Sequence, residues 1–308
     1  MVLRGHRQIP TQTIKHGKWD RRIGRATELI SAYPFAAEGL RFYARVAAFQ
    51  KLLYAEIQKA LADSPKTSAD RPLRDELDLF LLLPRFSGFL ALVEQIAPSP
   101  LAQAAAALAQ KGHGGWQRAI ENFWHGNAEL SAPDDGAGTH AGDVPEGRAA
   151  AFSEAPEIAD PDRLLAWIFL QPYAEYLADH REIAPLDGTP FTCPLCGGRP
   201  IVAVLRREGD GAKKSLICML CAHEWTFRRV YCPACGEERE PQMAFYSAPE
   251  IAHVRVDVCD TCRTYLKSVD LTKNGLAVPI VDELATIPLD LWAREHGYEK
   301  LQLNLLGT

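Results

Sequence analysis

Apolar and polar residues follow two different periods along the chain, and the change of period divides it. Up to about residue 183, apolar residues recur at intervals of three and four, the spacing of one helix face. Asp20 is the predicted N-cap of the first helix, and Asp160 followed by Pro161 predicts the start of another. The first half of the chain is therefore predicted to be all α. The expected helices cover residues 20–33, 35–63, 74–83, 86–97, 101–111, 116–127 and 160–183, with breaks at Pro34 and Pro84 and a bend near Pro172.

The pattern after residue 193 alternates in the manner of strands. Residues 201–217 alternate on either side of a Gly-Asp-Gly turn signal, which predicts a β-hairpin, and residues 243–258 predict a second hairpin. Residues 263–273 predict one more strand. A short helix around Leu289, Leu291 and Trp292 is expected to close the chain, followed by an apolar tail that we expect to dock onto a surface.

All eight cysteines lie in this second half, in four Cys-x-x-Cys pairs. Such a pair places two thiolates on one tight turn, and two pairs complete a tetrahedral metal site. Each hairpin brings its flanking pairs together, so consecutive pairs are expected to share an ion, although an interleaved pairing stays open. The sequence predicts two sites: Cys193, Cys196, Cys218 and Cys221 on one ion, and Cys232, Cys235, Cys259 and Cys262 on the other.

These patterns predict an α+β fold. An all-α domain over residues 1–186 is followed by two tandem metal modules of rubredoxin or zinc-ribbon type, and then by a short C-terminal helix and tail. Residues 126–160 are rich in Gly, Ala, Pro and Asp and predict a mobile loop within the helical domain. The remaining predicted boundaries are 187–230 for the first module, 231–275 for the second, and 276–308 for the helix and docking tail.

A chain of 308 residues can bury a core without disulfides, so the cysteines are not those of a small secreted scaffold. The first residues lack the apolar stretch of a secretory signal, which predicts a cytoplasmic protein. Residues 77–97 are strongly apolar, but Asp78, Arg85 and Glu94 interrupt them and Pro84 divides them. A pair of buried helices is expected there, and no membrane insertion.

Three kinds of function use such metal modules: nucleic-acid binding, electron transfer, and the stabilisation of an interaction surface. Residues 187–270 contain 11 Lys and Arg against 11 Asp and Glu, which disfavours nucleic acid. Two of the pairs have the form Cys-Pro-x-Cys-Gly that rubredoxin uses at iron, so electron transfer stays an alternative. In the other two pairs, Ala222 and Arg263 occupy the position where glycine most easily takes a positive φ.

His223 and Glu224 next to a cysteine pair could suggest acid–base chemistry. Four thiolates leave the ion no open position, so we expect these residues to support the metal ligands or the hairpin. No phosphate-binding loop or nucleophile motif is found in the sequence. The oligomeric state is left open, with a homodimer as one alternative.

The chain resembles the FdhE-type formate dehydrogenase accessory proteins. The resemblance lies in residues 220–225 (LCAHEW) with Arg228 or Arg229 before Cys232, in residues 259–267 (CDTCRTYLK), and in Leu289, Asp290, Gly297 and Tyr298. It implies a cytoplasmic, non-enzymatic factor needed to mature respiratory formate dehydrogenase, with the catalytic subunit of that enzyme as partner before export. It also implies iron at the two sites, whereas spacing alone favours zinc.

Overall fold

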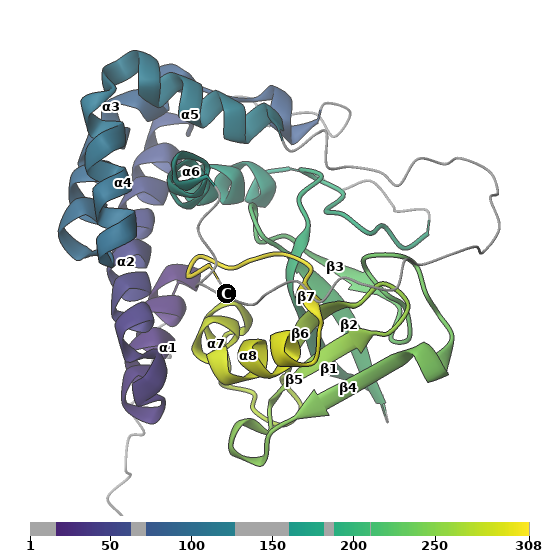
Figure 1. Ribbon diagram of the computed structural model, residues 1–308. Coiled ribbons are helices and arrows are strands. Elements are labelled where there is room, and N and C mark those ends of the chain that lie inside the picture. Colours follow the sequence, from purple (N-terminus) through teal and green to yellow (C-terminus); the bar gives the residue numbers. More distant parts are fainter. Residues whose placement is uncertain (1–16, 63–71, 127–159, 182–187, 210, 308) are drawn as a thin grey trace, which may run out of the picture.

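The computed structural model describes residues 17–62, 72–126, 160–181, 188–209 and 211–307. Helices form the first half of the chain, and a mixed sheet with two short helices forms the second (Figure 1). The predicted fold class is confirmed. The predicted mobile loop at 126–160 falls almost entirely outside the described residues.

In the described part of the N-terminal half there are six α-helices. They are α1 (Lys18–Ala32), α2 (Ala37–Ala60), α3 (Leu79–Ile96), α4 (Ser99–Gln110), α5 (Gly112–Gly126) and α6 (Pro161–Asp179), with short 3-10 turns η1 (Pro34–Ala36) and η2 (Leu73–Asp75). Helix α6 contacts α2, α3, α4 and α5, and nearly every side chain from Leu164 to Leu177 is buried. A helix that is apolar on all sides needs neighbours on all sides, so α6 forms the centre of the helical core.

Of the two predicted N-caps, Asp160 is confirmed and Asp20 is wrong. The Asp160 carboxylate accepts a hydrogen bond from the Arg163 amide at 3.0 Å and caps α6, as predicted. Asp20, however, lies within the first turn of α1, which begins at Lys18 after Gly17. Its carboxylate pairs with Lys51 of α2 and so joins the first two helices.

The predicted break at Pro84 is wrong, because α3 runs continuously from Leu79 to Ile96. Proline removes only the bond from its own nitrogen to the carbonyl of Phe80, and the Phe80 side chain is 96% exposed, so water can reach that turn. Asp78 caps the helix by accepting a bond from Leu81 N at 2.9 Å. The local cost of the proline is therefore smaller than the gain from packing the rest of the helix.

By length and composition, α3 is the one helix among the described residues that could cross a membrane. Five of its side chains are nevertheless buried inside the protein: Leu82, Phe86, Phe89, Leu90 and Val93. The rings of Phe86 and Phe89 pack against Phe169 of α6, with centroid separations of 4.8 and 5.5 Å. One face of α3 thus belongs to the helical core.

Among the described residues, seven strands form one mixed sheet in the order β3-β2-β1-β6-β5-β4, with β7 beside β6. Their bounds are β1 (Pro200–Glu208), β2 (Gly211–Cys218), β3 (Glu224–Phe227), β4 (Met243–Ser247), β5 (Val254–Cys259), β6 (Thr264–Asp270) and β7 (Glu299–Lys300), with 3-10 turns η4 (Glu240–Gln242) and η5 (Pro249–Ile251). Both predicted hairpins are present, as β1–β2 and β4–β5. The parallel pairing of β1 with β6, in which Ala203 lies opposite Ser268, joins the two modules into a single sheet.

Two helices cover one face of this sheet, where a single closing helix was predicted. Helix α7 (Pro279–Ala285) contacts β1 and β6, and α8 (Ile287–Glu295) contacts β5 and β7 (Figure 1). The division at Thr286 follows from Pro288, which has no N–H for the carbonyl of Leu284 and so cannot continue α7.

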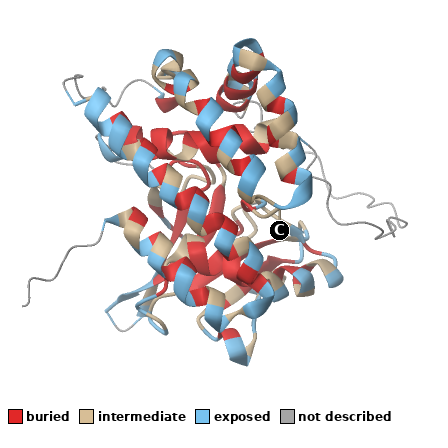
Figure 2. Cartoon of the chain, turned by 90° about the vertical axis from the view of Figure 1, so that its left-hand side faces the viewer, coloured by how far each residue is buried: buried red, intermediate tan, exposed pale blue. Residues whose placement is uncertain are grey.

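The C-terminal tail crosses from the sheet back to the helical half. A Cβ atom added at Gly39 of α2 would lie 2.6 Å from Cδ1 of Leu306, so glycine allows the tail to approach this helix closely. Leu305 is buried. The buried residues of helices and sheet form one continuous apolar core (Figure 2), and the tail packs against this core within its own chain.

Candidate metal centres

The first cluster forms where the turn before β1 meets the end of β2. Cys193 and Cys196 lie on that turn, while Cys218 ends β2 and Cys221 follows it. The Sγ separations are 3.5 Å for Cys193–Cys221, 3.3 Å for Cys196–Cys218 and 3.6 Å for Cys196–Cys221. All four cysteines are buried.

The second cluster has the same construction around β4 and β5, with Cys232 and Cys235 before β4, Cys259 at the end of β5 and Cys262 after it. Sγ of Cys232 lies 3.7 Å from Sγ of Cys262, and Cys235 lies 3.7 Å from Cys259. Cys232 and Cys259 are buried, Cys262 is half-buried and Cys235 is exposed. Consecutive cysteine pairs share a cluster in both cases, and the second cluster is reached by solvent.

The backbone of each turn positions the sulfurs. In the two Cys-Pro-x-Cys-Gly turns, the amides of Gly197 and Gly236 donate to the carbonyls of Cys193 and Cys232 at 2.8 and 3.0 Å. The Ala234 amide donates to Sγ of Cys232 at 3.4 Å. Amide donors to sulfur stabilise thiolate charge, as expected for metal-binding turns.

Both sulfur sets fit a tetrahedral ion. Metal–sulfur bonds of about 2.3 Å require tetrahedron edges of about 3.8 Å. The separations given above, 3.3 to 3.7 Å, lie close to this value, and all sulfurs of a cluster lie within 4.8 Å of one another. Four thiol donors match zinc or iron better than harder cations, so each cluster could hold one such ion.

Within each cluster the thiols influence one another strongly. Hydrogen bonds from neighbouring cysteines hold the pKa of Cys196 well below its ordinary value. Burial raises the pKa of Cys218 far above it, and burial also raises the pKa of Cys235 to about 11. Without a cation the four thiols cannot all ionise together, so an ion that binds four thiolates must displace protons.

Glu224 has contacts that explain its place beside the first cluster. Its carboxylate accepts two hydrogen bonds from the Arg206 guanidinium, at 2.9 and 2.7 Å, and one from the Ser215 hydroxyl. These partners lie on β1 and β2, so Glu224 ties β3 to the hairpin. His223 is half-buried, and burial lowers its pKa.

A cleft of about 730 Å³ separates α1 from the first module, with Cys221 and His223 on its wall. Its cations are mostly neutralised by neighbouring carboxylates. Lys18 and Arg22 pair with Glu175, and Arg206 pairs with Glu224. The charges of the cleft therefore do not select an anionic ligand.

Sequence reasoning missed Arg74, which comes from η2 in the helical half. Its Nε donates to the carbonyl of Cys196 at 2.7 Å, across 122 positions of sequence. Burial lowers the pKa of Arg74, and ionised Cys196, Cys218 and Cys221 would raise it. No motif surrounds Arg74, so the sequence held no signal for this contact.

Two domain models of one protein family match the chain consecutively. The model described as "FdhE, central domain" matches residues 192–229, and "FdhE, C-terminal domain" matches residues 230–306. The first range contains the first cluster and the second range contains the other.

Curated relatives give the same result over part of the chain. A protein FdhE homolog of Aquifex aeolicus is 32% identical over 141 residues, which is 45% of this chain and 50% of that protein. A protein FdhE homolog of Haemophilus ducreyi is 30% identical over 156 residues, 50% of this chain and 51% of that protein. The chain thus spans about half the length of the curated relatives it matches.

The crystal structure of the FdhE protein from Pseudomonas aeruginosa shares the fold. The TM-score is 0.60 at 23% identity, and the match covers 94% of this chain and 96% of that one. It extends over the helical half, which the domain models do not reach. Residues 192–306 therefore match the central and C-terminal domains of FdhE, and the chain as a whole shares the fold of a solved FdhE protein.

Proposed function

We propose that this protein is a cytoplasmic accessory factor required for the maturation of respiratory formate dehydrogenase, and that it binds the catalytic subunit of that enzyme before export. The observation that carries the proposal is the match of both FdhE domain models over residues 192–306, each with one complete tetracysteine cluster. The role is one of assembly and not of catalysis.

The construction of the clusters supports a non-enzymatic role. Four thiolates complete the coordination of a tetrahedral ion, which leaves no position for a substrate or an activated water. The clusters lie at the ends of strands in one sheet and connect its loops. Metal binding would therefore stabilise the shape of a surface.

We propose one metal ion in each cluster, held by Cys193, Cys196, Cys218 and Cys221 and by Cys232, Cys235, Cys259 and Cys262. Iron is favoured by the family resemblance, with zinc as the alternative. Elemental analysis of protein purified without oxygen should give two ions per chain, and iron would show the red colour of ferric thiolate once the sample is oxidised in air. One ion per chain, or a cluster containing inorganic sulfide, would contradict the proposal.

The charge of the metal modules supports a protein partner over nucleic acid. Residues 187–270 contain equal numbers of acidic and basic residues, 11 of each, before any thiolate is included. Four thiolates on a divalent ion add two negative charges at each site. A polyanion would be repelled, whereas the surface of another protein need not be.

A deletion strain tests the function. Without the gene, respiratory formate oxidation should be lost while the catalytic polypeptide is still made. The wild-type gene should restore activity, and a gene carrying Cys193→Ser and Cys232→Ser should not. Tagged wild-type protein should co-purify with the catalytic subunit after anaerobic growth, and the cysteine variant should retain less. Unchanged formate oxidation in the deletion strain would overturn the assignment.

Electron transfer is the second candidate, and the exposure of Cys235 favours it because a carrier needs a centre near the surface. A carrier requires a metal that changes oxidation state, and zinc does not. Zinc-reconstituted protein can be added to an extract of the deletion strain. We expect it to restore part of the enzyme's activity, as a structural role requires; restoration by the iron form alone would favour the carrier.

A further inference from the structure

Arg74 is a buried cation between the two halves of the molecule. It lies in η2 (Leu73–Asp75), and the residue is only 8% exposed. Its side chain extends from the helical half to the turn that carries Cys193 and Cys196. It therefore connects the helices to the first cluster directly.

The position of the guanidinium is determined by several contacts. Nε donates to the carbonyl of Cys196 at 2.7 Å, and Nη1 donates to the carbonyl of Trp124. In return, the indole of Trp124 donates to the carbonyl of Arg74 at 2.7 Å, and the Trp124 ring centroid lies 6.0 Å from Cζ. The side chain cannot move towards solvent without breaking these bonds.

The acceptors of Arg74 are all neutral carbonyls. Its Nη2 is buried and has no hydrogen-bond partner among the residues that the structure describes. Other buried cations reach a carboxylate, as Arg22 does with Glu175 at 2.7 Å and Lys214 with Asp257 at 2.8 Å. Arginine stays protonated in proteins, and a buried charge needs compensation. A negative charge must therefore be supplied by some other group.

We propose that the first tetracysteine cluster supplies this charge, and that Arg74 is the counter-charge that holds a divalent ion in it. The inference rests on the proposed metal binding. Four thiolates on a divalent ion carry a net charge of two negative units, and they lie beside the carbonyl that Arg74 binds. Retention of metal in the first cluster thus depends on a residue of the helical half.

The second cluster has no equivalent in the described part of the chain. Its neighbouring arginines have their own carboxylates, since Arg239 pairs with Glu237 at 2.6 Å and Arg263 pairs with Asp260 at 2.9 Å. Water reaches this cluster at Cys235 and can stabilise its charge. Removal of Arg74 should therefore affect one of the two ions.

The test measures zinc release from the full-length, zinc-loaded protein to an excess of a chromophoric chelator. Arg74→Gln removes the charge, and Arg74→Lys keeps it while losing the planar fork of hydrogen bonds. Arg118→Gln, on the exposed surface of α5, is the matched control. Each release phase is assigned to a cluster with the Cys193→Ser, Cys196→Ser and Cys232→Ser, Cys235→Ser double variants.

Arg74→Gln should release the first zinc at least about tenfold faster, equivalent to about 1.4 kcal/mol. The second zinc should leave at the wild-type rate. Arg74→Lys should stay within about threefold of wild type, and Arg118→Gln should not differ from it. If Arg74 acts only through packing and hydrogen bonds, Arg74→Gln and Arg74→Lys should release the first zinc equally fast. Their metal-free forms should then also be equally destabilised.

Equal release rates in the glutamine and lysine variants, or faster release from both clusters, would overturn the inference. If Arg74→Gln does not fold, Arg74→Lys provides the test. This variant keeps the positive charge, so rapid loss of the first zinc from its folded form would contradict a role for charge. Failure of wild-type protein to bind zinc or iron at all would instead disprove the proposed metal binding.

Discussion

In all four cysteine turns, the residue after the second cysteine has a left-handed backbone. The φ values are 69° at Gly197, 75° at Gly236, 52° at Ala222 and 57° at Arg263. Glycine adopts this conformation freely, whereas a side chain is strained there. The sequence predicts that glycine fits best directly after the second cysteine of each turn. The backbone is left-handed at this position in all four turns.

Ala222→Gly should leave the first cluster intact and raise the free energy of unfolding of the zinc-loaded protein by up to about 1 kcal/mol, because the strain at a positive φ is removed. Urea denaturation followed by circular dichroism measures the change. A clear loss of stability would show that the alanine methyl group makes a contact worth more than the strain.

Arg263→Gly should have the opposite effect, although the backbone strain is also removed. The guanidinium lies 3.9 Å from the Tyr298 ring centroid and pairs with Asp260 at 2.9 Å. Loss of these contacts should lower the free energy of unfolding by about 1 kcal/mol in the same assay. A more stable Arg263→Gly protein would mean that these half-exposed contacts contribute nothing.

Asp282 is a fully buried carboxylate with two side-chain partners, and it also accepts a hydrogen bond from the Val278 amide at 2.7 Å. Arg25 of α1 donates to it at 2.6 and 3.0 Å, and His253 lies 2.8 Å from Oδ1. Burial opposes its ionisation, but the bonds from His253 and Arg25 more than compensate, so the pKa of Asp282 is lowered. This carboxylate holds α7 against α1.

Because the folded pKa of Asp282 is lowered, its contribution to stability is present above the unfolded pKa of about 4 and is lost as pH falls below it. Asp282→Asn should therefore cost about 3 kcal/mol at pH 7 and progressively less below pH 4. Urea denaturation of wild type and Asp282→Asn at each pH measures the difference in their free energies of unfolding. Acid releases the metal from both proteins alike, so this loss does not affect the difference. The exposed Glu295→Gln control should cost less than about 0.5 kcal/mol throughout.

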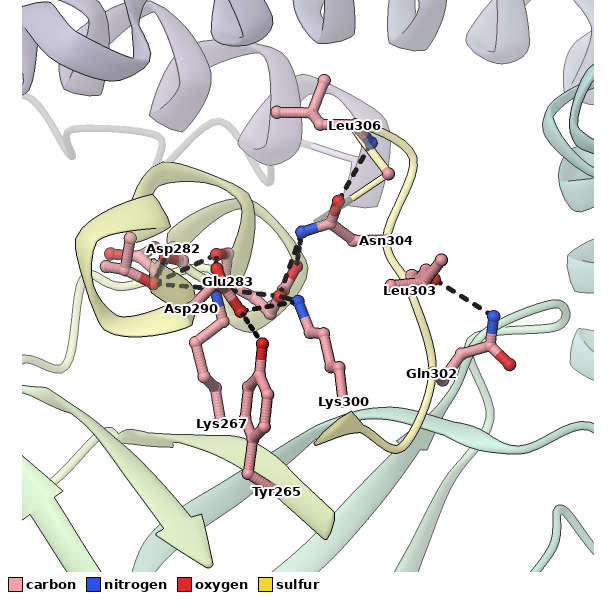
Figure 3. A network of polar contacts seen from close by, with 12 residues as sticks. Tyr265, Lys267, Asp282, Glu283, Asp290, Lys300, Gln302, Leu303, Asn304 and Leu306 are labelled. Atoms are coloured by element: carbon pink, nitrogen blue, oxygen red, sulfur yellow. Dashed lines mark hydrogen bonds and ion pairs between the residues drawn. The ribbon is translucent and has the colours of Figure 1, made fainter. Parts of the chain in front are cut away.

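At the scale of the elements, a buried ionic network joins β6, α7, α8 and the C-terminal tail (Figure 3). Lys267 binds Asp290 at 2.6 Å, and Lys300 lies 3.0 Å from the same carboxylate. Glu283 accepts from both lysines and from the Asn304 amide at 3.1 Å. Two cations balance two carboxylates, so the network attaches the tail to α7 without a net buried charge.

Lys300→Met should lower the free energy of unfolding by about 3 to 5 kcal/mol, because it leaves a buried carboxylate uncompensated. Adding Glu283→Gln restores the charge balance, so the double variant should lose less than the sum of the two single variants. The exposed Lys59→Met serves as control. Additive losses in urea denaturation would show that the network is not coupled.

On the scale of the whole molecule, the first cluster is bonded to the helical half. Trp167 and Gln171 of α6 donate to the carbonyl of Met219 at 3.1 and 3.0 Å, and Met219 lies between Cys218 and Cys221. The second cluster lies next to β4 and the α8–β7 turn. Loss of the two clusters should therefore have different consequences.

Cys193→Ser should increase hydrogen exchange in α6, since the Met219 turn loses its support when the first ion is lost. Cys232→Ser should increase exchange in β4 and β5 and leave α6 as in wild type. Hydrogen-exchange mass spectrometry of the zinc-loaded variants measures both. Equal protection of α6 in the two variants would mean that the helical half folds independently of the first cluster.

Local patterns determined the helical half, the two hairpins and the grouping of the cysteines. A Cys-x-x-Cys turn and a hairpin are short-range structures, so the residues that must meet are close in the sequence and carry distinctive chemistry. The same reasoning failed at Pro84, because the gain from packing α3 into the core exceeds the local preference to break the helix.

Tertiary structure alone decided how the parts are joined. The parallel pairing of β1 with β6, the contact of Arg74 with Cys196 and the closure of the Lys300 network all link distant residues of ordinary type. Nothing in such residues identifies their partners, because an arginine or a valine can pair with many others. Only the packing of the helices and the sheet around one core selects the contacts that are made.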